Sequence, residues 1–143
     1  MDKKTFKKIT NQCFINQGFT LNGKVLYKEN EKLIVNIELD KSRFDDIYYI
    51  YAYVWIKDLH QNFSYNTLPN EYDTFGGLRF LENDDKLFSI YYLELESNEY
   101  KEKLNILIPK NLNPIFEENI QYLKKSNKFI FSPKVKEYLE KYN

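Results

Sequence analysis

The sequence predicts an α+β fold, and three observations lead to that class. Residues 3–17 carry an apolar stripe with helical spacing, residues 24–56 are dominated by strand-like alternation, and helical patterns return from residue 97 onward. Helices that follow a block of strands usually pack against an antiparallel sheet. We therefore expect an N-terminal helix, an antiparallel sheet of about four to five strands and C-terminal helices, in a single domain over residues 1–143.

The first expected element is an amphipathic helix over residues 3–17, with lysines on its polar side. Its apolar stripe consists of Phe6, Ile9, Cys13 and Phe14. Gly18 follows at the position where a left-handed residue often ends a helix. Because Cys13 lies on the apolar stripe, we predict a buried, unreactive thiol.

Two strands are expected next, over residues 24–28 and 32–39, with a tight turn at Asn30. A longer strand, residues 47–56, is rich in β-branched and aromatic side chains. Its alternation sorts the side chains onto two faces. The first face holds Tyr48, Ile50, Ala52, Val54 and Ile56. The second face holds what we call the aromatic row, which is Tyr49, Tyr51, Tyr53 and Trp55.

Pairing residues 32–39 with residues 47–56 would bury the aliphatic sides of both strands and place Asn36 and Glu38 beside the aromatic row. Four exposed rings would exceed the apolar patch usual on a monomer. Either helices or a partner must then cover the row. We expect the C-terminal helices to cover it.

The remaining chain is predicted from turn and helix signals. Residues 57–77 read as a long surface loop. Residues 78–81 and 87–95 are expected to form a hairpin about residues 83–85, although residues 87–93 also fit a helix. Helices are expected to begin at Ser97, at Asn113-Pro114 and at Ser132-Pro133, with Pro109 ending the first of them.

Charge is balanced over the whole chain but not along it. Residues 38–102 hold 14 of the 21 acidic and 6 of the 21 basic residues, so the middle carries −8 and the two ends together +8. The acidic middle favours a cationic protein partner and makes nucleic-acid binding unlikely. A single cysteine and the lack of a long apolar run predict a cytoplasmic protein without membrane contact. We expect it to act as a monomer or weak homodimer.

No catalytic signature emerges from residue types and spacing. With one His and one Cys, His60 and Cys13, a zinc site is not expected, and we predict no cofactor. An acidic cluster remains as an alternative: loop carboxylates could converge with the two arginines to handle a metal or a phosphate. Those residues are Asp45, Asp46, Glu71, Asp73, Arg43 and Arg79. The simpler interpretation is that each arginine forms a structural ion pair.

The segment Asp40-Lys41-Ser42-Arg43-Phe44, followed by Tyr48-Tyr49-Ile50, resembles the signature of the bacterial domain-of-unknown-function family 4304. Gly18-Phe19, Pro69, Glu71 and Arg79 fit the same pattern. The chain departs from it at Asp40, where the family has Gln, at Tyr51, where it has Asn, and at Tyr53, where it has Gly. The resemblance implies an α+β fold, a bacterial origin and, for some members, a role as immunity proteins of toxin systems. It implies no established reaction.

The sequence thus predicts a protein that acts by binding, of the immunity type that neutralises a cationic toxin, rather than an enzyme. The alternative is a metal- or phosphate-handling enzyme built on the loop acids and arginines. The residues expected to bind the partner are Asp40, Arg43, Asp45, Asp46, Tyr49, Tyr51, Tyr53, Trp55, Glu71, Asp73 and Arg79.

Overall fold

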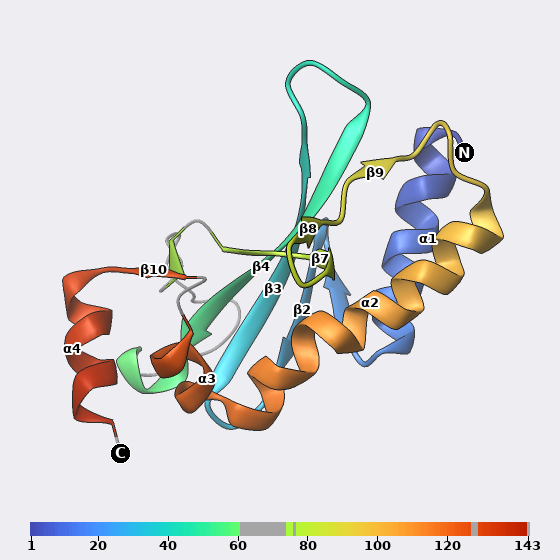
Figure 1. Cartoon of the computed structure of the whole chain (residues 1–143). Coiled ribbons are helices and arrows are strands. Elements are labelled where there is room, and N and C mark those ends of the chain that lie inside the picture. The colour runs from blue at the N-terminus through green and yellow to red at the C-terminus, as the bar shows by residue number, and fades with distance from the viewer. Residues whose placement is uncertain (61–73, 76, 127–128, 143) are drawn as a thin grey trace.

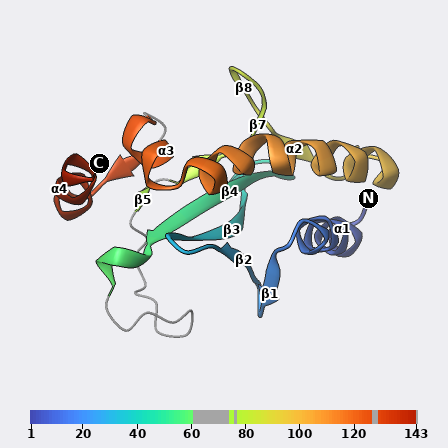
Figure 2. The ribbon, with the colours of Figure 1, turned by 90° about the horizontal axis from the view of Figure 1, so that it is seen from below.

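The computed structural model describes residues 1–60, 74–75, 77–126 and 129–142. These residues form an α+β structure in which helices pack against one face of an antiparallel sheet (Figures 1 and 2). The helices are α1 (Lys3–Asn16), η1 (Lys57–Leu59), α2 (Ser97–Glu118), α3 (Ile120–Lys125) and α4 (Pro133–Lys141). The strands are β1 (Thr20–Asn22), β2 (Val25–Glu29), β3 (Leu33–Lys41), β4 (Ile47–Ile56), β5 (Thr74–Phe75), β6 (Leu78–Arg79), β7 (Leu81–Asn83), β8 (Lys86–Leu87), β9 (Ile90–Tyr91) and β10 (Ile130–Phe131).

The main sheet has six strands in the order β1-β2-β3-β4-β6, and β9 also pairs with β4. Its first turn is at Gly23, whose φ of 63° suits a residue without a side chain. Strand β1 was not foreseen from the sequence. The expected turn at Asn30 is confirmed: its side-chain oxygen accepts hydrogen bonds from the backbone N–H groups of Lys32 and Leu33, at 3.0 and 2.9 Å. The side chain therefore holds the β2–β3 connection closed.

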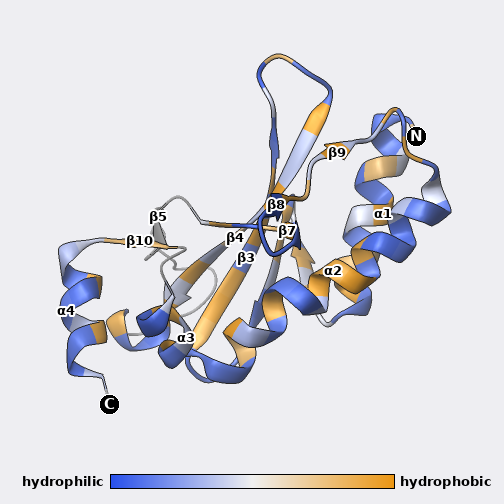
Figure 3. Cartoon of the chain, in the orientation of Figure 1, coloured by the Kyte–Doolittle hydropathy of each residue, from blue (hydrophilic) through white to orange (hydrophobic). Residues whose placement is uncertain are grey.

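The β3–β4 pair confirms the predicted register. Val35 lies opposite Val54 and Ile37 opposite Ala52, while Asn36 faces Tyr53 on the other side of the sheet. Cross-strand partners share a face, so the aliphatic sides of both strands point the same way. Figure 3 shows the resulting hydrophobic stretches along β3, β4 and α2.

Helices α1 and α2 pack side by side against this aliphatic face (Figure 1). Phe6 of α1 contacts the rings of Tyr48 and Tyr100, with centroid distances of 5.0 and 5.4 Å. Thr10 and Tyr100 share a buried hydrogen bond of 2.6 Å, and the Thr10 hydroxyl also donates to the Phe6 carbonyl at 2.8 Å. The polar atoms between the two helices are thus paired inside an otherwise apolar contact.

Helix α2 corrects the predicted helix boundaries. It runs without interruption through Pro109 and Pro114, neither of which ends or begins a helix. Its N-cap is Glu96, not Ser97, and the Glu96 carboxylate accepts from the backbone N–H groups of Asn98 and Glu99. A proline inside a helix costs roughly 3 kcal/mol. Apolar packing on both sides of the prolines offsets that cost, through the buried side chains of Leu107, Ile108, Leu112 and Ile115.

The expected hairpin around residues 83–85 exists but is shorter than predicted. Its strands are β7 and β8, whereas Leu78–Arg79 pairs with β4 and residues 87–95 do not form one continuous strand. The side chain of Asn111 in α2 fixes β7: its Oδ1 accepts from the Leu81 N–H at 2.9 Å, and its Nδ2 donates to the Leu81 carbonyl at 3.0 Å. The Asn111 amide thus makes the pair of backbone hydrogen bonds with Leu81 that a neighbouring strand would make.

The expectation that C-terminal helices cover the aromatic row is wrong for the described chain. The buried side chains of α2, α3 and α4 join the core on the opposite, aliphatic face of the sheet. Tyr51 and Trp55 are nevertheless only 6% and 4% exposed. Helix α4 begins as predicted, with Ser132 as its N-cap and Pro133 in its first turn. Most of the predicted 57–77 loop lies outside the described residues.

Candidate functional site

The candidate site lies at the end of the β3–β4 hairpin, which extends beyond the helices in Figure 1. Pairing continues without a break to Lys41 and Tyr48, and the Ser42 N–H then donates to the Ile47 carbonyl at 2.9 Å to close the turn. Strand β2 stops pairing with β3 at Ile37, so the last residues of β3 continue past it. On the other side, Tyr91 of β9 lies opposite Ile47 and supports only the base of the turn.

Among the described residues, Phe44 is the most exposed large hydrophobic side chain, at 91%. It occupies the middle of the turn, where its backbone N–H donates to the Ser42 hydroxyl at 3.4 Å. Tyr91, opposite Ile47 at the base of the turn, is also exposed, at 48%. Exposed aromatic side chains at one turn are typical of a surface that contacts another molecule.

Charged residues surround Phe44. Arg43 and Asp45 are exposed on either side of it, and Asp40 is exposed at the end of β3. Lys41 and Asp46 form an ion pair of 3.7 Å, with about half of each side chain in solvent. Such a pair stabilises the fold by at most about 1 kcal/mol. We call Asp40, Arg43, Phe44, Asp45, Asp46 and Tyr91 the hairpin-tip surface.

The aromatic row begins next to this surface and becomes more deeply buried along β4. Tyr49, opposite Asp40, and Tyr53 are half-buried, whereas Tyr51 and Trp55 are buried. Tyr51 and Tyr53 stack with their ring centroids 5.9 Å apart. Tyr51 and Trp55 are therefore too enclosed to touch a partner directly, and the exposed residues of the predicted site are those of the hairpin tip together with Arg79 on β6.

Arg79 joins the row rather than the acidic turn. It lies opposite Tyr51 in the sheet, with its guanidinium carbon 5.2 Å from the centre of the Tyr51 ring. Burial raises the pKa of the Tyr53 hydroxyl, and the nearby Glu38, Tyr51 and Asp40 raise it further, while Arg79 acts in the opposite direction. These effects favour the neutral phenol, whose O–H can serve as a hydrogen-bond donor.

Two residues beside the row were not predicted as site residues. Gly77 has a φ of 63°, and a Cβ at this position would lie 2.9 Å from a ring carbon of Tyr53. Asn36 is 4% exposed, and its side-chain oxygen is buried without a hydrogen-bond partner among the described residues. The adjacent glycines at 76 and 77 signalled a close backbone approach, but nothing in the sequence indicated which ring would be approached.

The predicted acidic cluster is not assembled within the described residues. Arg43 lies in the hairpin turn and Arg79 on β6, while Glu71 and Asp73 lie outside the described residues. In the part of the chain that the structure describes, no three His, Cys, Asp or Glu side chains group closely enough to hold a metal ion. Cys13 is 1% exposed, as predicted, and burial raises the pKa of its thiol.

None of the described helices has both the length and the apolar character needed to cross a membrane.

Phe44 could have been identified from the sequence, because it is the one apolar residue in the polar run 40–46 between two strands. Tyr91 could not, since its position depends on β9 pairing with β4 over a long sequence separation.

Comparison with known proteins gives one match. No curated protein and no solved structure matches the chain. A protein family described as "Domain of unknown function (DUF4304)" matches residues 10–118, which include the second half of α1, the whole main sheet and α2. The chain belongs to this DUF4304 family.

Proposed function

We propose that this protein is a binding protein of the immunity type, which neutralises a cationic toxin by docking it on the hairpin-tip surface. The observation that carries this proposal is Phe44, 91% exposed in a turn that extends beyond the rest of the described structure (Figure 1). The fold gains nothing from a phenylalanine at this position. Burying such a ring against a partner contributes about 1.5–3 kcal/mol, so the side chain is suited to anchor a complex.

The charges around the anchor support a partner of positive charge. Four acidic residues and two basic residues lie within residues 38–46, and the ion pair between Lys41 and Asp46 neutralises one charge of each sign. Asp40 and Asp45 have no ion-pair partner among the described residues. An acidic rim around an aromatic anchor accelerates encounter with a basic surface and sets its orientation.

The hairpin also has the rigidity that such a site requires. β3 and β4 pair over nine consecutive positions, and their aliphatic side chains are fixed in the core at the other end of the hairpin. A turn held in this way loses little conformational entropy when it binds. The half-buried Tyr49, opposite Asp40, and Tyr53, further along β4, carry hydroxyls that can donate hydrogen bonds.

Site-specific photo-crosslinking in the source cells tests the proposal. The photoreactive residue p-benzoylphenylalanine replaces Phe44 in one variant and Ile106 in the control. Ile106 is also exposed, at 67%, but lies on α2 away from the hairpin. The proposal predicts one dominant protein adduct at position 44, to a protein with a basic surface that arrests growth when expressed alone. That adduct should be absent at position 106.

Two results would refute the proposal. Equal adducts at both positions would mean that capture reflects exposure alone. A position-44 partner whose toxicity is unaffected by co-expression of this protein would exclude the immunity role while leaving the hairpin as a binding surface.

A further inference from the structure

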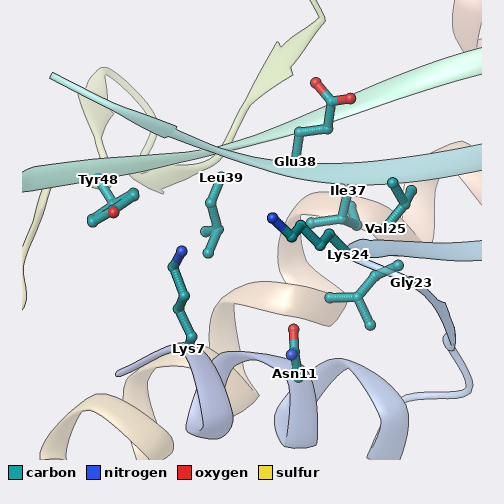
Figure 4. Close-up of a pocket in the computed structure, with 10 residues that line it drawn as sticks. Lys7, Asn11, Gly23, Lys24, Val25, Ile37, Glu38, Leu39 and Tyr48 are labelled. Carbon is teal, nitrogen blue, oxygen red and sulfur yellow. The ribbon is translucent and has the colours of Figure 1, made fainter. Parts of the chain in front are cut away.

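A pocket of about 450 Å³ lies between α1 and the sheet, on the opposite side of β3 from the aromatic row. It forms where β2 stops pairing with β3: Leu26 opposite Ile37 is the last pair, and the chain then turns away through Lys24 and Gly23. Leu39 continues over the space that β2 leaves, and α1 closes it from below (Figure 4). The volume is within the range of small-molecule sites.

One wall of the pocket is apolar. Val25, Ile37, Leu39 and Tyr48 line it, and the buried Tyr48 ring is fixed by contacts with Phe6 and Tyr92 at 5.0 and 5.7 Å. This wall offers hydrocarbon contact but few hydrogen bonds. If the ligand were an ion without an apolar part, the apolar wall would remain exposed to water.

Two lysines supply the charge. Lys7 and Lys24 both line the pocket, and Figure 4 shows their ammonium ends on either side of the Leu39 side chain, with the Asn11 amide pointing toward it from α1. Neither lysine forms an ion pair with a described residue. Glu38, also at the pocket, points away from this space in Figure 4. Two ammonium groups that line one pocket without an ion-pair partner among the described residues favour an anion there.

From this geometry we infer that the pocket binds a small organic anion: a carboxylate attached to an aliphatic or aromatic body. The carboxylate lies between Lys7 and Lys24 and accepts a hydrogen bond from the Asn11 amide, while the apolar body covers Leu39 and Tyr48. Ammonium groups are compact point charges, unlike the planar fork of arginine, so they suit one anionic head without demanding a particular shape. This site is separate from the hairpin-tip surface and does not depend on the proposed function.

Isothermal titration of the full chain with sodium octanoate tests the inference, with 1-octanol, sodium acetate and inorganic phosphate as comparison ligands. Octanoate should saturate one site with a Kd of about 1 mM or tighter. Lys7→Gln and Lys24→Gln should each weaken it about fivefold, the factor that corresponds to ~1 kcal/mol for one exposed charge pair. Lys8→Gln is the matched control: it is exposed on the same helix but does not line the pocket, and it should bind as the wild type does.

Each other outcome overturns the inference. If 1-octanol binds as well as octanoate, the pocket is apolar without selecting an anion. If acetate or phosphate binds as well, the apolar wall plays no part. A Lys8→Gln variant weakened as much as Lys7→Gln would show non-specific attraction to the helix, and no saturable binding by octanoate would leave the pocket without a ligand of this class. The exchanged lysine side chains are exposed, so each variant is expected to fold. Circular dichroism checks this before the titration.

Discussion

At the scale of single residues, Ala52 is a small side chain enclosed among larger ones in the sheet. It is 0% exposed, pairs with Ile37 on one side and with Leu78 on the other, and lies in the core that α1 and α2 cover. A larger side chain has no space there. We expect Ala52→Leu to lower the free energy of unfolding by roughly 1–3 kcal/mol through overpacking, measured by urea denaturation. Thr20→Leu, on the exposed β1, is the control and should be nearly neutral; equal stability of both variants would contradict this packing.

Asn111 provides a second test at this scale, because its amide makes two hydrogen bonds to the backbone of Leu81 that tie β7 to α2. Asn111→Ala leaves the N–H and carbonyl of Leu81 without those partners. We expect a loss of about 1–3 kcal/mol in the free energy of unfolding. Asn113→Ala removes an exposed amide from the same helix and should stay within about 0.5 kcal/mol of the wild type. Equal effects would show that Asn111 acts through helix propensity.

The buried Tyr100 hydroxyl should make the free energy of unfolding depend on pH in the alkaline range. Burial raises the pKa of its hydroxyl above the ordinary value of 10.0, although the hydrogen bond with Thr10 lowers it in part. The folded state thus holds a proton that the unfolded chain releases above about pH 10. The stability linked to this group is fully present below that pH and is lost as the pH rises toward the folded-state pKa.

Tyr100→Phe should flatten the alkaline fall of stability while costing about 0.5–1.5 kcal/mol at pH 7 for the lost hydrogen bond. Thr10→Val removes the same hydrogen bond but keeps the ionisable phenol, so its stability should still fall steeply. Urea denaturation from pH 7 to 11 gives both curves. Parallel curves for Tyr100→Phe and the wild type above pH 10 would contradict the assignment.

At the scale of elements, α2 carries the clearest prediction. Pro109 lies inside a continuous helix, so its ring prevents a hydrogen bond to the carbonyl four residues earlier. Pro109→Ala should raise the free energy of unfolding by about 1–2 kcal/mol, the helix cost of roughly 3 kcal/mol less the greater freedom of the unfolded chain. Pro133→Ala, in the first turn of α4 where proline is favourable, should give no gain. If Pro109→Ala left the free energy of unfolding unchanged, the helix would have to end at Pro109.

The elements also show which information the sequence contains. The β3–β4 register was predictable because alternation fixes which side of each strand is buried, and a shift of one residue would expose every aliphatic side chain. The same reasoning failed for α2, where tertiary packing of Leu107 and Ile108 outweighs two prolines. It failed again for β9, whose pairing with β4 is a long-range contact with little local signal.

The candidate site divides in the same way. The acidic turn and the aromatic row could be read directly from residues 39–56, and the structure places them on one hairpin. The burial of Tyr51 and Trp55 could not be predicted from the sequence. The exposure of Phe44 could have been, because it is the one apolar residue in the polar run 40–46, but it was not among the predicted site residues. The pocket beneath Leu39 was also missed, because it depends on where β2 diverges from β3 above α1.

At the scale of the whole molecule, the uneven charge is the property that a partner would detect. Residues 38–102 carry −8 and the rest of the chain +8, although the formal net charge is zero. The acidic segment includes the hairpin tip, so the proposed function predicts that a cationic partner is attracted to the end of the molecule that presents Phe44. Attraction of this kind acts mainly on the rate of encounter.

The rate of association between this protein and the partner captured at position 44 tests the central claim most directly. It should be measured by biolayer interferometry as the salt concentration rises from 0.1 to 1 M, which shortens the Debye length from ~10 Å to ~3 Å. We predict that the association rate constant falls steeply across that range while the dissociation rate constant changes little. An association rate constant that does not respond to salt would contradict the claim that the acidic hairpin tip recruits a cationic partner.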